Sequence, residues 1–399
     1  MMQLKRVEVK NFKSLENVTV ASLRTMNMLY GYNNTGKSNF LRFIELIFRR
    51  KIRLGSVKYV DVVPTELRTE EQVGWWEGQF EHPAFMFTDD RRDQLITFAF
   101  DIAISHDELG ELSDRLYADF LSQDHGISQV RFEGTIRSVT TTLSEISLKR
   151  VNINKKKAYD SLEKDGTKRY FPLSKGLKGQ SDTLNLFLTL FNDCVLFLDS
   201  NRYLTEEKEL QELPGLLRAQ NAKSWLFNYY IDSQKYADYE NFIKFLQAYK
   251  SSHLGEDALN ARRHWPFSTG DVGFGRSGQS IEVMLRNPKG RLPLSSYGTG
   301  VQQIFYLLEK LFFAPACIVL IEEIELNLSP AAQREFFINL QRLLTANHID
   351  QVIFTTHSHY FKYRGDFRIF VAVLDKKGYT SIIRKKTAEV AFFKRDVIS

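Results

Sequence analysis

The chain has 399 residues, of which 43% are apolar and 26% charged, with a formal net charge of +6. These values are typical of a globular protein with enough chain for two or three packed units. No apolar run reaches the ~18 residues that a membrane span needs, and the N-terminus lacks the apolar core of a secretion signal. We therefore expect a cytoplasmic protein with no membrane partner.

Two features of the composition bear on binding chemistry. Cys194 and Cys317 both lie in apolar runs, which favours buried reduced thiols over a disulfide or a zinc site. Basic residues gather in short clusters that suit a polyanion such as DNA, although a mildly basic surface is most often simply solvated. The clusters are residues 49–53, 154–157, 261–263 and 383–386.

The first strong motif is GYNNTGKS, residues 31–38, which satisfies the pattern G-x-x-x-x-G-K-[ST]. TMNMLY just before it predicts a buried strand, and the apolar spacing of residues 40–48 predicts a helix directly after it. Glycines let the backbone N–H groups of the loop converge on phosphate oxygens at the helix N-terminus. Lys37 would supply charge for the β- and γ-phosphates, and Ser38 a hydroxyl for Mg²⁺. A plain glycine turn before an amphipathic helix is the alternative interpretation.

The middle of the chain predicts strands and then helices. Alternating stretches between residues 90 and 155 predict antiparallel strands that complete the nucleotide-binding lobe. A helical insertion follows over residues 205–262, and its many aromatic residues suit either a helical-hairpin core or contact with a neighbouring chain. Residues 51–89 show no regular pattern.

The last third of the chain contains a turn and two strand ends that carry polar residues. A serine- and glycine-rich turn, residues 295–300, precedes a strongly periodic helix, and its N-terminus suits an anion or an ordinary cap. QVIFTTHSHYF, residues 351–361, predicts a strand followed by His357. A histidine at that position can sense a γ-phosphate by hydrogen bonding, although an isolated histidine is more often structural.

Paired acids follow another predicted strand. The apolar run at residues 317–321 predicts a buried parallel strand, since such strands are apolar on both faces. Glu322 and Glu323 come directly after it. One carboxylate can enter the Mg²⁺ shell and the other can polarise the attacking water. An exposed acidic strand end is the alternative.

In this order the motifs resemble those of ABC-type ATPases, and most closely the branch that contains SMC proteins, RecF-like proteins and the ATPase domains of OLD-family (overcoming lysogenization defect) nucleases. LKRVEVKNFKSLENVTV (residues 4–20) resembles the opening hairpin of that branch, and GYNNTGKSN its GxNxxGKSN. SYGTG stands where the signature serine and glycine belong, IEEIELNLSP resembles EEPExxLHP, and TTHS resembles the switch-histidine segment. LFLDSNRYL (196–204) resembles a recurring segment that ends in Asn-Arg. The resemblance covers residues 1–50 and 290–375.

The resemblance implies a fold and a set of site residues. The fold is an α/β P-loop NTPase of ABC-ATPase type, with a mixed central sheet, an antiparallel β subdomain and a short helical insertion. ATP and Mg²⁺ are the implied cofactors. Glu323 and His357 are the implied catalytic residues, and Ser38 and Glu322 the implied metal ligands. The implied nucleotide-binding residues are Gly31, Asn33, Asn34, Thr35, Gly36, Lys37, Ser38, Asn39, Ser296 and Gly298.

In the family, the signature turn of one subunit covers the nucleotide held by the other. One phosphate loop and one signature therefore imply a homodimer or higher homo-oligomer with composite ATP sites, in which Ser296 and Gly298 act in trans. The sequence departs from the family pattern after the acids and after TTHS, which bears on coupling between subunits. The departing residues are Ile324, Asn327, Ser329 and His359.

We expect three segments along the chain. Residues 1–204 form the N-terminal part of the ATPase domain, residues 205–262 a helical arm for oligomerisation or partner binding, and residues 263–399 the C-terminal part with the signature, acids and histidine. The sequence shows no sustained heptads, so we do not expect the long coiled-coil arms of SMC proteins. The stretch after His357 is too short for the nuclease domain of OLD proteins.

Three functions are compatible with these features. The chain further resembles ATPase subunits of two-gene antiphage systems such as the PARIS type, which implies a scaffold or sensor that hydrolyses ATP and controls a separate effector, a nuclease or toxin encoded nearby. The alternative is a RecF- or SMC-like ATPase that clamps DNA directly in repair or chromosome maintenance. A third possibility is a binding-only switch with negligible turnover.

Overall fold

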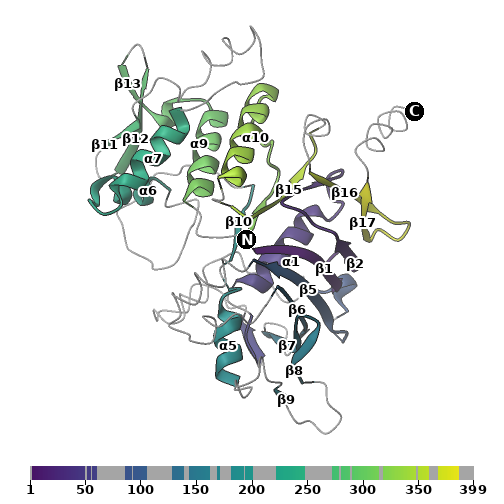
Figure 1. Ribbon diagram of the computed structural model, residues 1–399. Helices are drawn as coiled ribbons and strands as arrows, with labels where there is room; N and C mark the ends of the chain where they lie inside the picture. The colour runs from purple at the N-terminus through teal and green to yellow at the C-terminus, as the bar shows by residue number, and fades with distance from the viewer. Residues whose placement is uncertain are drawn as a thin grey trace. The chain divides into compact units, whose positions relative to one another are not determined.

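The computed structural model forms two compact units (Figure 1). Unit 1 comprises Met1–Phe197, Pro315–Glu322 and Ile349–Ser399, and unit 2 comprises Leu198–Ala314 and Glu323–His348. The division into three consecutive segments stays a prediction. The structure describes residues 2–49, 52–54, 56–60, 86–91, 93–105, 128–138, 143–161, 169–170, 181–192, 194–200, 222–247, 272–277, 280–287, 290–313, 318–346, 349–358 and 367–385.

The first sheet is largely parallel and has the strand order β10-β14-β15-β3-β16-β17. β14, β15, β3 and β16 run parallel to one another, whereas β17 pairs antiparallel with β16. Every residue of β14 and β15 is buried. This explains the unbroken apolar character of β14, whereas β15 also buries the polar residues Gln351, Thr355 and Thr356. The bounds are Val195–Leu198 (β10), Ile318–Ile321 (β14), Gln351–Thr356 (β15), Met26–Tyr30 (β3), Arg368–Leu374 (β16) and Thr380–Lys385 (β17).

The second sheet is antiparallel and has the order β2-β1-β5-β6-β7-β8-β9, with β4 paired to β7. Burial alternates along β6, so that one face of the sheet enters the core. On β6, Arg131 forms ion pairs with Glu8 and Asp101 of two other strands. The bounds are Met2–Phe12 (β1), Leu15–Ala21 (β2), Ser56–Val60 (β4), Ile96–Ile104 (β5), Gln129–Ser138 (β6), Leu143–Ile153 (β7), Lys156–Asp160 (β8) and Arg169–Tyr170 (β9).

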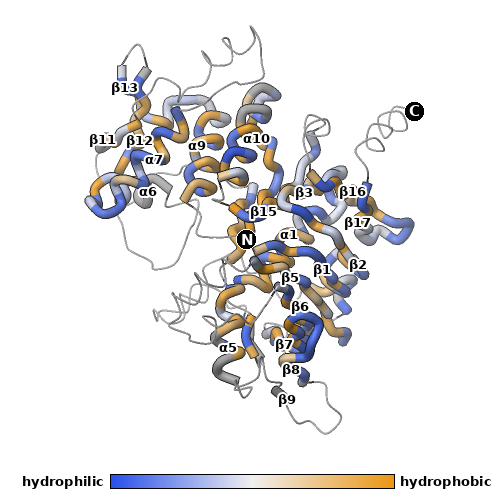
Figure 2. Tube along the Cα trace, in the orientation of Figure 1, coloured by the Kyte–Doolittle hydropathy of each residue, from blue (hydrophilic) through white to orange (hydrophobic). Residues whose placement is uncertain are grey.

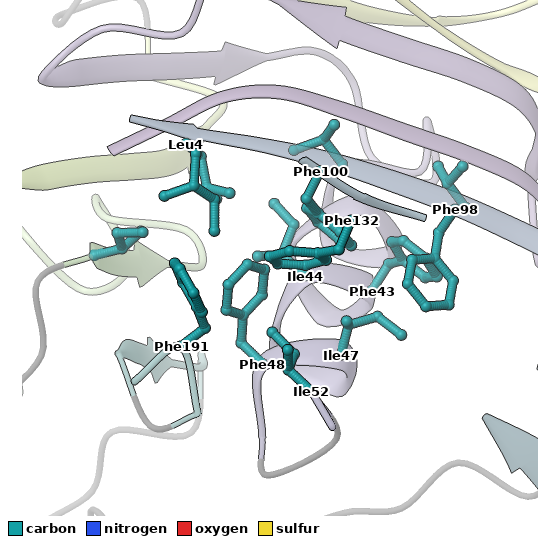
Figure 3. Packing of buried hydrophobic residues seen from close by; sticks show 14 of the residues in the cluster. Leu4, Phe43, Ile44, Ile47, Phe48, Ile52, Phe98, Phe100, Phe132 and Phe191 are labelled. Atoms are coloured by element: carbon teal, nitrogen blue, oxygen red, sulfur yellow. The ribbon is translucent and has the colours of Figure 1, made fainter. Parts of the chain in front are cut away.

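Helix α1 (Lys37–Phe48) anchors the core of unit 1. Its apolar residues recur every three or four positions, and they contact the antiparallel sheet on one side (Figure 3). The Phe43 ring stacks on Phe100 with centroids 6.0 Å apart, and Phe48 meets the same ring edge-on at 5.1 Å. The same helix also contacts β14 and β15 of the parallel sheet. The helix that begins at the phosphate loop is therefore fixed between both sheets.

Unit 2 combines helices with a small antiparallel sheet of order β11-β12-β13. Helix α9 packs against α10 and α6, and α6 also packs against α7 and β12. Figure 2 shows α9 as mostly hydrophobic, in keeping with its long buried stretch. The bounds are Ala222–Ile231 (α6), Tyr236–Gln247 (α7), Val272–Ser277 (β11), Ser280–Asn287 (β12), Gly290–Pro293 (β13), Leu294–Ser296 (η4), Thr299–Phe312 (α9) and Pro330–Thr345 (α10).

The aromatic residues of the predicted helical insertion divide into two groups. Phe242 is fully buried and packs on Phe305 and Phe312 of α9, with ring centroids 5.9 and 5.3 Å apart. Tyr230 and Tyr236 are instead 40% exposed. A helical core thus accounts for part of the aromatic content, and contact of the exposed rings with a neighbouring chain stays a prediction.

Several smaller predictions can be placed. Cys194 is buried and forms no disulfide among the described residues, whereas Cys317 lies outside them. The Asn-Arg pair at 201–202, the cluster at 261–263, His359 and most of residues 51–89 also lie outside them. Among the described helices, none is long and apolar enough to cross a membrane. The remaining elements are the helix α5 (Ser181–Thr189) and the single turn η2 (Thr88–Asp90).

Candidate nucleotide-binding site

Three adjacent parallel strands end at one edge of the sheet, and each is followed by a predicted site residue. Phe354 of β15 pairs with Ile321 of β14 and with Met28 of β3. Glu322, His357 and Gly31 come directly after these strands. In open α/β sheets ligands bind at the carboxyl ends of the parallel strands, especially where the strand order changes direction. The strand register therefore gathers three separate motifs of unit 1 at the edge where a ligand is expected.

The loop between β3 and α1 has the backbone shape of an anion cradle. Asn34 has φ 59° and Gly36 φ 86°, both in the left-handed region. Gly36 is the N-cap of α1, and the first helical bond, from Phe40 N to Gly36 O, leaves the preceding N–H groups outside the intrahelical ladder. Alternation of right- and left-handed residues before a helix N-terminus directs N–H groups to a common point, which suits phosphate oxygens.

Lys37 is folded back onto the loop that it follows. Its Nζ donates hydrogen bonds to the carbonyl oxygens of Gly31 (2.9 Å) and Tyr32 (2.6 Å). The Thr35 hydroxyl donates to the same Tyr32 carbonyl at 2.8 Å. Lys37 is only 5% exposed, but these backbone carbonyl dipoles solvate its charge in place of water. A phosphate arriving at the loop would offer this ammonium a charged acceptor in their place.

Glu322 has a buried carboxylate at the end of β14, with 4% exposure. No described residue donates a hydrogen bond to its Oε2, and Arg42 Nη2 on α1 is 3.6 Å away. A buried carboxylate oxygen costs free energy unless it is paired or binds a cation. Carboxylate and hydroxyl oxygens suit Mg²⁺, and Ser38 lies in the first turn of α1 in the same unit. The residues present therefore fit the metal that sequence analysis predicted.

Glu323 marks a sharp turn of the chain. It has φ 46°, which is unusual for a residue with a side chain, and its carbonyl oxygen accepts a hydrogen bond from Leu326 N at 2.9 Å. It is also the first residue of a segment of unit 2, whereas Glu322 is the last residue of a segment of unit 1. Strained backbone of this kind is common at functional sites.

His357 is half-buried and directly follows β15. Thr356, the last residue of that strand, pairs with Tyr30, which precedes the phosphate loop. The Thr356 hydroxyl also accepts a hydrogen bond from Ser358 N at 3.0 Å and so shapes the turn that holds the histidine. The register thus places the start of the loop and His357 beyond the ends of neighbouring strands.

The predicted signature residues lie in unit 2. Ser296 ends the short turn η4 and is exposed, and exposed Gly298 is the N-cap of α9. Apart from its chain neighbours, no described residue has an atom within 4 Å of the position where a Cβ of Gly298 would be. Gly300 differs, because its Cβ would lie 2.8 Å from the Asn327 carbonyl oxygen. Packing within the described chain explains the glycine at 300 but not the one at 298.

The remaining predicted residues of the loop differ in their surroundings. Asn33 and Asn34 are exposed. Asn39 donates a hydrogen bond from its Nδ2 to the Ser14 hydroxyl at 3.0 Å, and its role toward a nucleotide stays a prediction. Sequence analysis assigned no role to Arg42 or Ser14. Arg42 lies one helical turn after Ser38, which is the only signal in the sequence that places it near the loop.

Comparison with known proteins gives the family. The model of the AAA ATPase domain family matches residues 2–361, which is most of the chain. No curated protein matches. ATP is the nucleotide, and ATP hydrolysis the general activity, that this family implies.

Solved structures with a similar fold include three heads of SMC proteins. The SMC head domain from Thermotoga maritima is 12% identical, with 96% of this chain and 99% of that chain covered and a TM-score of 0.42. An SmcHead bound to the C-winged helix domain of ScpA is 11% identical, with 98% and 99% covered and a TM-score of 0.49. The Smc head with an extended coiled coil, bound to the C-terminal domain of ScpA derived from Pyrococcus furiosus, is 12% identical, with both chains fully covered and a TM-score of 0.46. Together with the strand–loop–helix element, the family match shows that the chain belongs to the AAA ATPase domain family.

Proposed function

We propose that this protein binds ATP with Mg²⁺ and hydrolyses it at the edge of the parallel sheet, as an ABC-type ATPase of the SMC- and RecF-like kind. The observation that carries the proposal is the pairing of a cradle-shaped loop with the buried Glu322 oxygen, to which no described residue donates a hydrogen bond. Loop N–H groups and Lys37 would bind the phosphates, and Ser38 and Glu322 would hold the metal. Bound Mg²⁺ neutralises charge on the phosphate oxygens.

The chain's own side chains would then do three things. Lys37 would transfer its hydrogen bonds from the Gly31 and Tyr32 carbonyls to the phosphates. Glu323 would orient the attacking water and accept its proton, and His357 would hydrogen-bond the γ-phosphate. Such groups contribute by positioning and by electrostatics, and general-base assistance typically supplies about 10²–10⁴-fold in rate.

A direct test compares the unmodified protein with Lys37→Ala. ATP affinity, measured by titration calorimetry in Mg²⁺, is expected to fall below detection in the variant, because the loop loses its only lysine. Lys244→Ala is the matched control, since that lysine is exposed on α7 of unit 2 and pairs only at 3.7 Å with Glu240. Unchanged affinity in Lys37→Ala would refute the proposed site.

We further propose that two copies of the chain complete each ATP site, with Ser296 and Gly298 supplied in trans. Their exposure supports this, as does a glycine at 298 that packing in the described chain does not require. Glycine there would let a partner's nucleotide approach the α9 N-terminus closely.

Mixing inactive variants tests sharing of the site. Lys37→Ala and Ser296→Glu are each expected to be inactive, but a mixed dimer contains one site in which both the loop and the signature are unaltered. ATPase activity should therefore return on mixing. At a Mg²⁺ concentration too low to support activity of Glu322→Gln alone, a mixture of Lys37→Ala with Glu322→Gln should stay inactive, because both changes affect the loop side of each site. Failure of the first mixture to recover, although subunits exchange, would contradict composite sites.

For the biological role, we propose that the nucleotide state controls a separate effector protein, a nuclease or toxin, in antiphage defence. The resemblance of the motif set to ATPase subunits of two-gene systems supports this role. The protein expressed with the product of its neighbouring gene should capture that product in the presence of ATP, and Lys37→Ala should not. Capture that is equal for both would argue against control by nucleotide.

One observation favours direct DNA binding as a second candidate. Arg24, Arg368 and Arg384 lie near one another in unit 1, since burial and then the charges of Arg384 and Arg24 lower the pKa of Arg368 from its ordinary value. Arg24 and Arg384 are exposed. Clustered arginines suit phosphate backbones.

Salt dependence separates the two candidates. Direct binding predicts ATP-stimulated affinity for a duplex that falls steeply between about 50 and 200 mM salt, and that falls further in the double variant Arg24→Glu, Arg384→Glu. Affinity that is weak at low salt and unchanged in the variant would exclude the arginine cluster as a DNA site and favour effector control.

A further inference from the structure

The phosphate loop rests on the last β-hairpin of unit 1. A Cβ added to Gly31 would lie 2.5 Å from the Ala372 carbonyl oxygen of β16. A Cβ added to Gly36 would lie 2.6 Å from the Ser14 hydroxyl oxygen and closer still to that of Thr380, the first residue of β17. Both glycines of the motif are therefore backed by atoms that leave no room for a side chain.

The turn between β1 and β2 supplies the second support. Lys13 has φ 49°, and both its backbone N–H and its carbonyl oxygen form hydrogen bonds, with Met86 and Thr88 respectively. Lys13 N donates to Met86 O at 2.8 Å, and the Thr88 hydroxyl donates to Lys13 O at 2.5 Å. Ser14, the next residue, is thereby held at a fixed position below the loop.

Ser14 joins three segments through one oxygen atom. Its Oγ accepts hydrogen bonds from Asn39 Nδ2 (3.0 Å) and from Thr380 Oγ1 (2.7 Å). The Ser14 carbonyl oxygen accepts a further bond from Thr380 N at 2.8 Å. Asn39 lies in the first turn of α1, whose N–H groups face the phosphates in the proposed site. We call Ser14, Asn39 and Thr380 the hydroxyl node.

Because the hydroxyl node lies against Gly36, it fixes the residue whose left-handed backbone shapes the cradle. Thr380 is 3% exposed, so its hydroxyl has little access to water and depends on Ser14 as its acceptor. Removing one partner of a buried hydrogen bond leaves the other unsatisfied, which is more costly than losing the bond alone.

We infer that Ser14 and Thr380 are positioning residues for ATP, which hold Gly36 and the first turn of α1 in the phosphate-binding conformation without touching the nucleotide. This inference rests on the proposed binding of ATP to the loop. It also gives Asn39 a different task from the one that sequence analysis assigned, since its amide nitrogen anchors α1 to Ser14.

Matched substitutions at residue 380 test the inference. Thr380→Val keeps the shape and removes the hydroxyl, whereas Thr380→Ser keeps the hydroxyl and removes a methyl group. ATP affinity is expected to fall about fivefold to tenfold in Thr380→Val and Ser14→Ala, and to stay within about twofold in Thr380→Ser. KM should rise with the dissociation constant while kcat changes less. Thr345→Val, at an exposed hydroxyl on α10, is the control for the exchange itself.

A double-variant cycle provides an independent measurement. Ser14→Ala combined with Thr380→Val should weaken ATP binding by less than the product of the single effects, because both remove the same hydrogen bond. If Thr380→Val does not fold, Ser14→Ala alone carries the test, with its unfolding temperature measured beside its affinity.

Several results would overturn the inference. The first is ATP affinity equal to that of the unmodified protein in both Ser14→Ala and Thr380→Val. The second is an equal loss of ATP affinity in Thr380→Ser and Thr380→Val. The third is a double variant whose loss of ATP affinity equals the full product of the two single losses. Lys37→Ala distinguishes failure of the positioning role from failure of the proposed function. If it abolishes binding while the node variants bind normally, only the positioning role is wrong. If it binds normally, the proposed function is wrong.

Discussion

Arg42 Nη2 on α1 lies 3.6 Å from the buried Oε2 of Glu322 at the end of β14. This ion pair joins the helix that starts at the phosphate loop to the strand that carries the acids. Arg42 is one third exposed whereas Glu322 is almost fully buried, so the pair places a cation at the carboxylate before any metal arrives.

Glu322→Gln should impair use of Mg²⁺. The amide keeps the shape of the side chain but loses the charge that a hard cation prefers. The Mg²⁺ concentration for half-maximal ATPase activity is expected to rise by about tenfold or more, in line with about 1.4 kcal/mol of lost metal affinity. Steady-state ATPase assays over a Mg²⁺ series measure this. Glu16→Gln, at a partly exposed carboxylate of β2 that pairs with Arg91, is the control, and an unchanged Mg²⁺ dependence in Glu322→Gln would contradict a metal role.

Glu323→Gln should separate binding from turnover. Loss of the carboxylate is expected to lower kcat by about 10²-fold or more, while ATP affinity changes little, because the proposed role of Glu323 is toward the attacking water. The variant should accumulate as an ATP-bound oligomer, detectable by light scattering coupled to size-exclusion chromatography. Turnover near that of the unmodified protein would instead support a binding-only switch.

The glycines at 298 and 300 give opposite expectations. Gly300→Ala brings a Cβ to 2.8 Å from the backbone of Asn327, which should cost about 1–2 kcal/mol after the gain in helix propensity. Gly298→Ala meets no described atom within 4 Å apart from its chain neighbours and should cost under about 1 kcal/mol, through the weaker N-cap preference of alanine, yet lower ATPase activity if a partner's nucleotide approaches there. Thermal unfolding and ATPase assays on both variants measure this. Full activity in Gly298→Ala would argue against close approach.

Phe43→Ala should be among the most destabilising single changes in unit 1. The side chain is fully buried on α1 and contacts the Phe12 and Phe100 rings at 4.9 and 6.0 Å. Loss of a large buried ring typically costs about 3–5 kcal/mol. Urea unfolding followed by circular dichroism measures it. Leu95→Ala, at a side chain that is 48% exposed, should cost under about 1 kcal/mol.

Asp89, at the turn before β5, should make stability depend on pH. Hydrogen bonds from Tyr379 and Arg91 hold the pKa of Asp89 below its ordinary value of 3.8. The bond to Asp89 likewise raises the pKa of the Tyr379 phenol above 10.0. A lowered carboxyl pKa stabilises the folded state above the unfolded pKa, and that contribution is lost as the pH falls through the folded value.

The comparison of Asp89→Asn with the unmodified protein tests this dependence. The variant should unfold at a lower temperature near pH 7, and the difference should disappear as the pH falls below about 4. Tyr379→Phe should show the same trend, because it removes the main donor to Asp89. A difference that persists at acid pH would show that the substitution acts through packing.

Local patterns made much of the fold predictable. The strand before the loop, the helix after it, and the strands before the acids and before His357 are all confirmed as elements, because each has its own hydrophobic period and boundary residues. The resemblance predicted the mixed and antiparallel sheets, which are also confirmed. The roles of the site residues stay predictions.

Contacts between distant segments were not predictable in the same way. Ser14 and Thr380 are 366 positions apart, and neither hydroxyl differs in sequence from an ordinary turn or strand residue. Nothing in the sequence distinguishes Arg42 from an ordinary charged residue of an amphipathic helix, and Glu322 comes near it only because α1 packs against β14 in the folded chain. Such relationships depend on strand order and register, which a single sequence does not specify.

The support of the phosphate loop by the last hairpin has a consequence for biosynthesis. During translation the GYNNTGKS segment is made before the atoms behind its two glycines, which belong to Ala372 and Thr380. Its strand, β3, also lies between β15 and β16, which are both made after it. A nascent chain should therefore gain affinity for nucleotide only after Thr380 has been made and the β16–β17 hairpin has folded behind the loop.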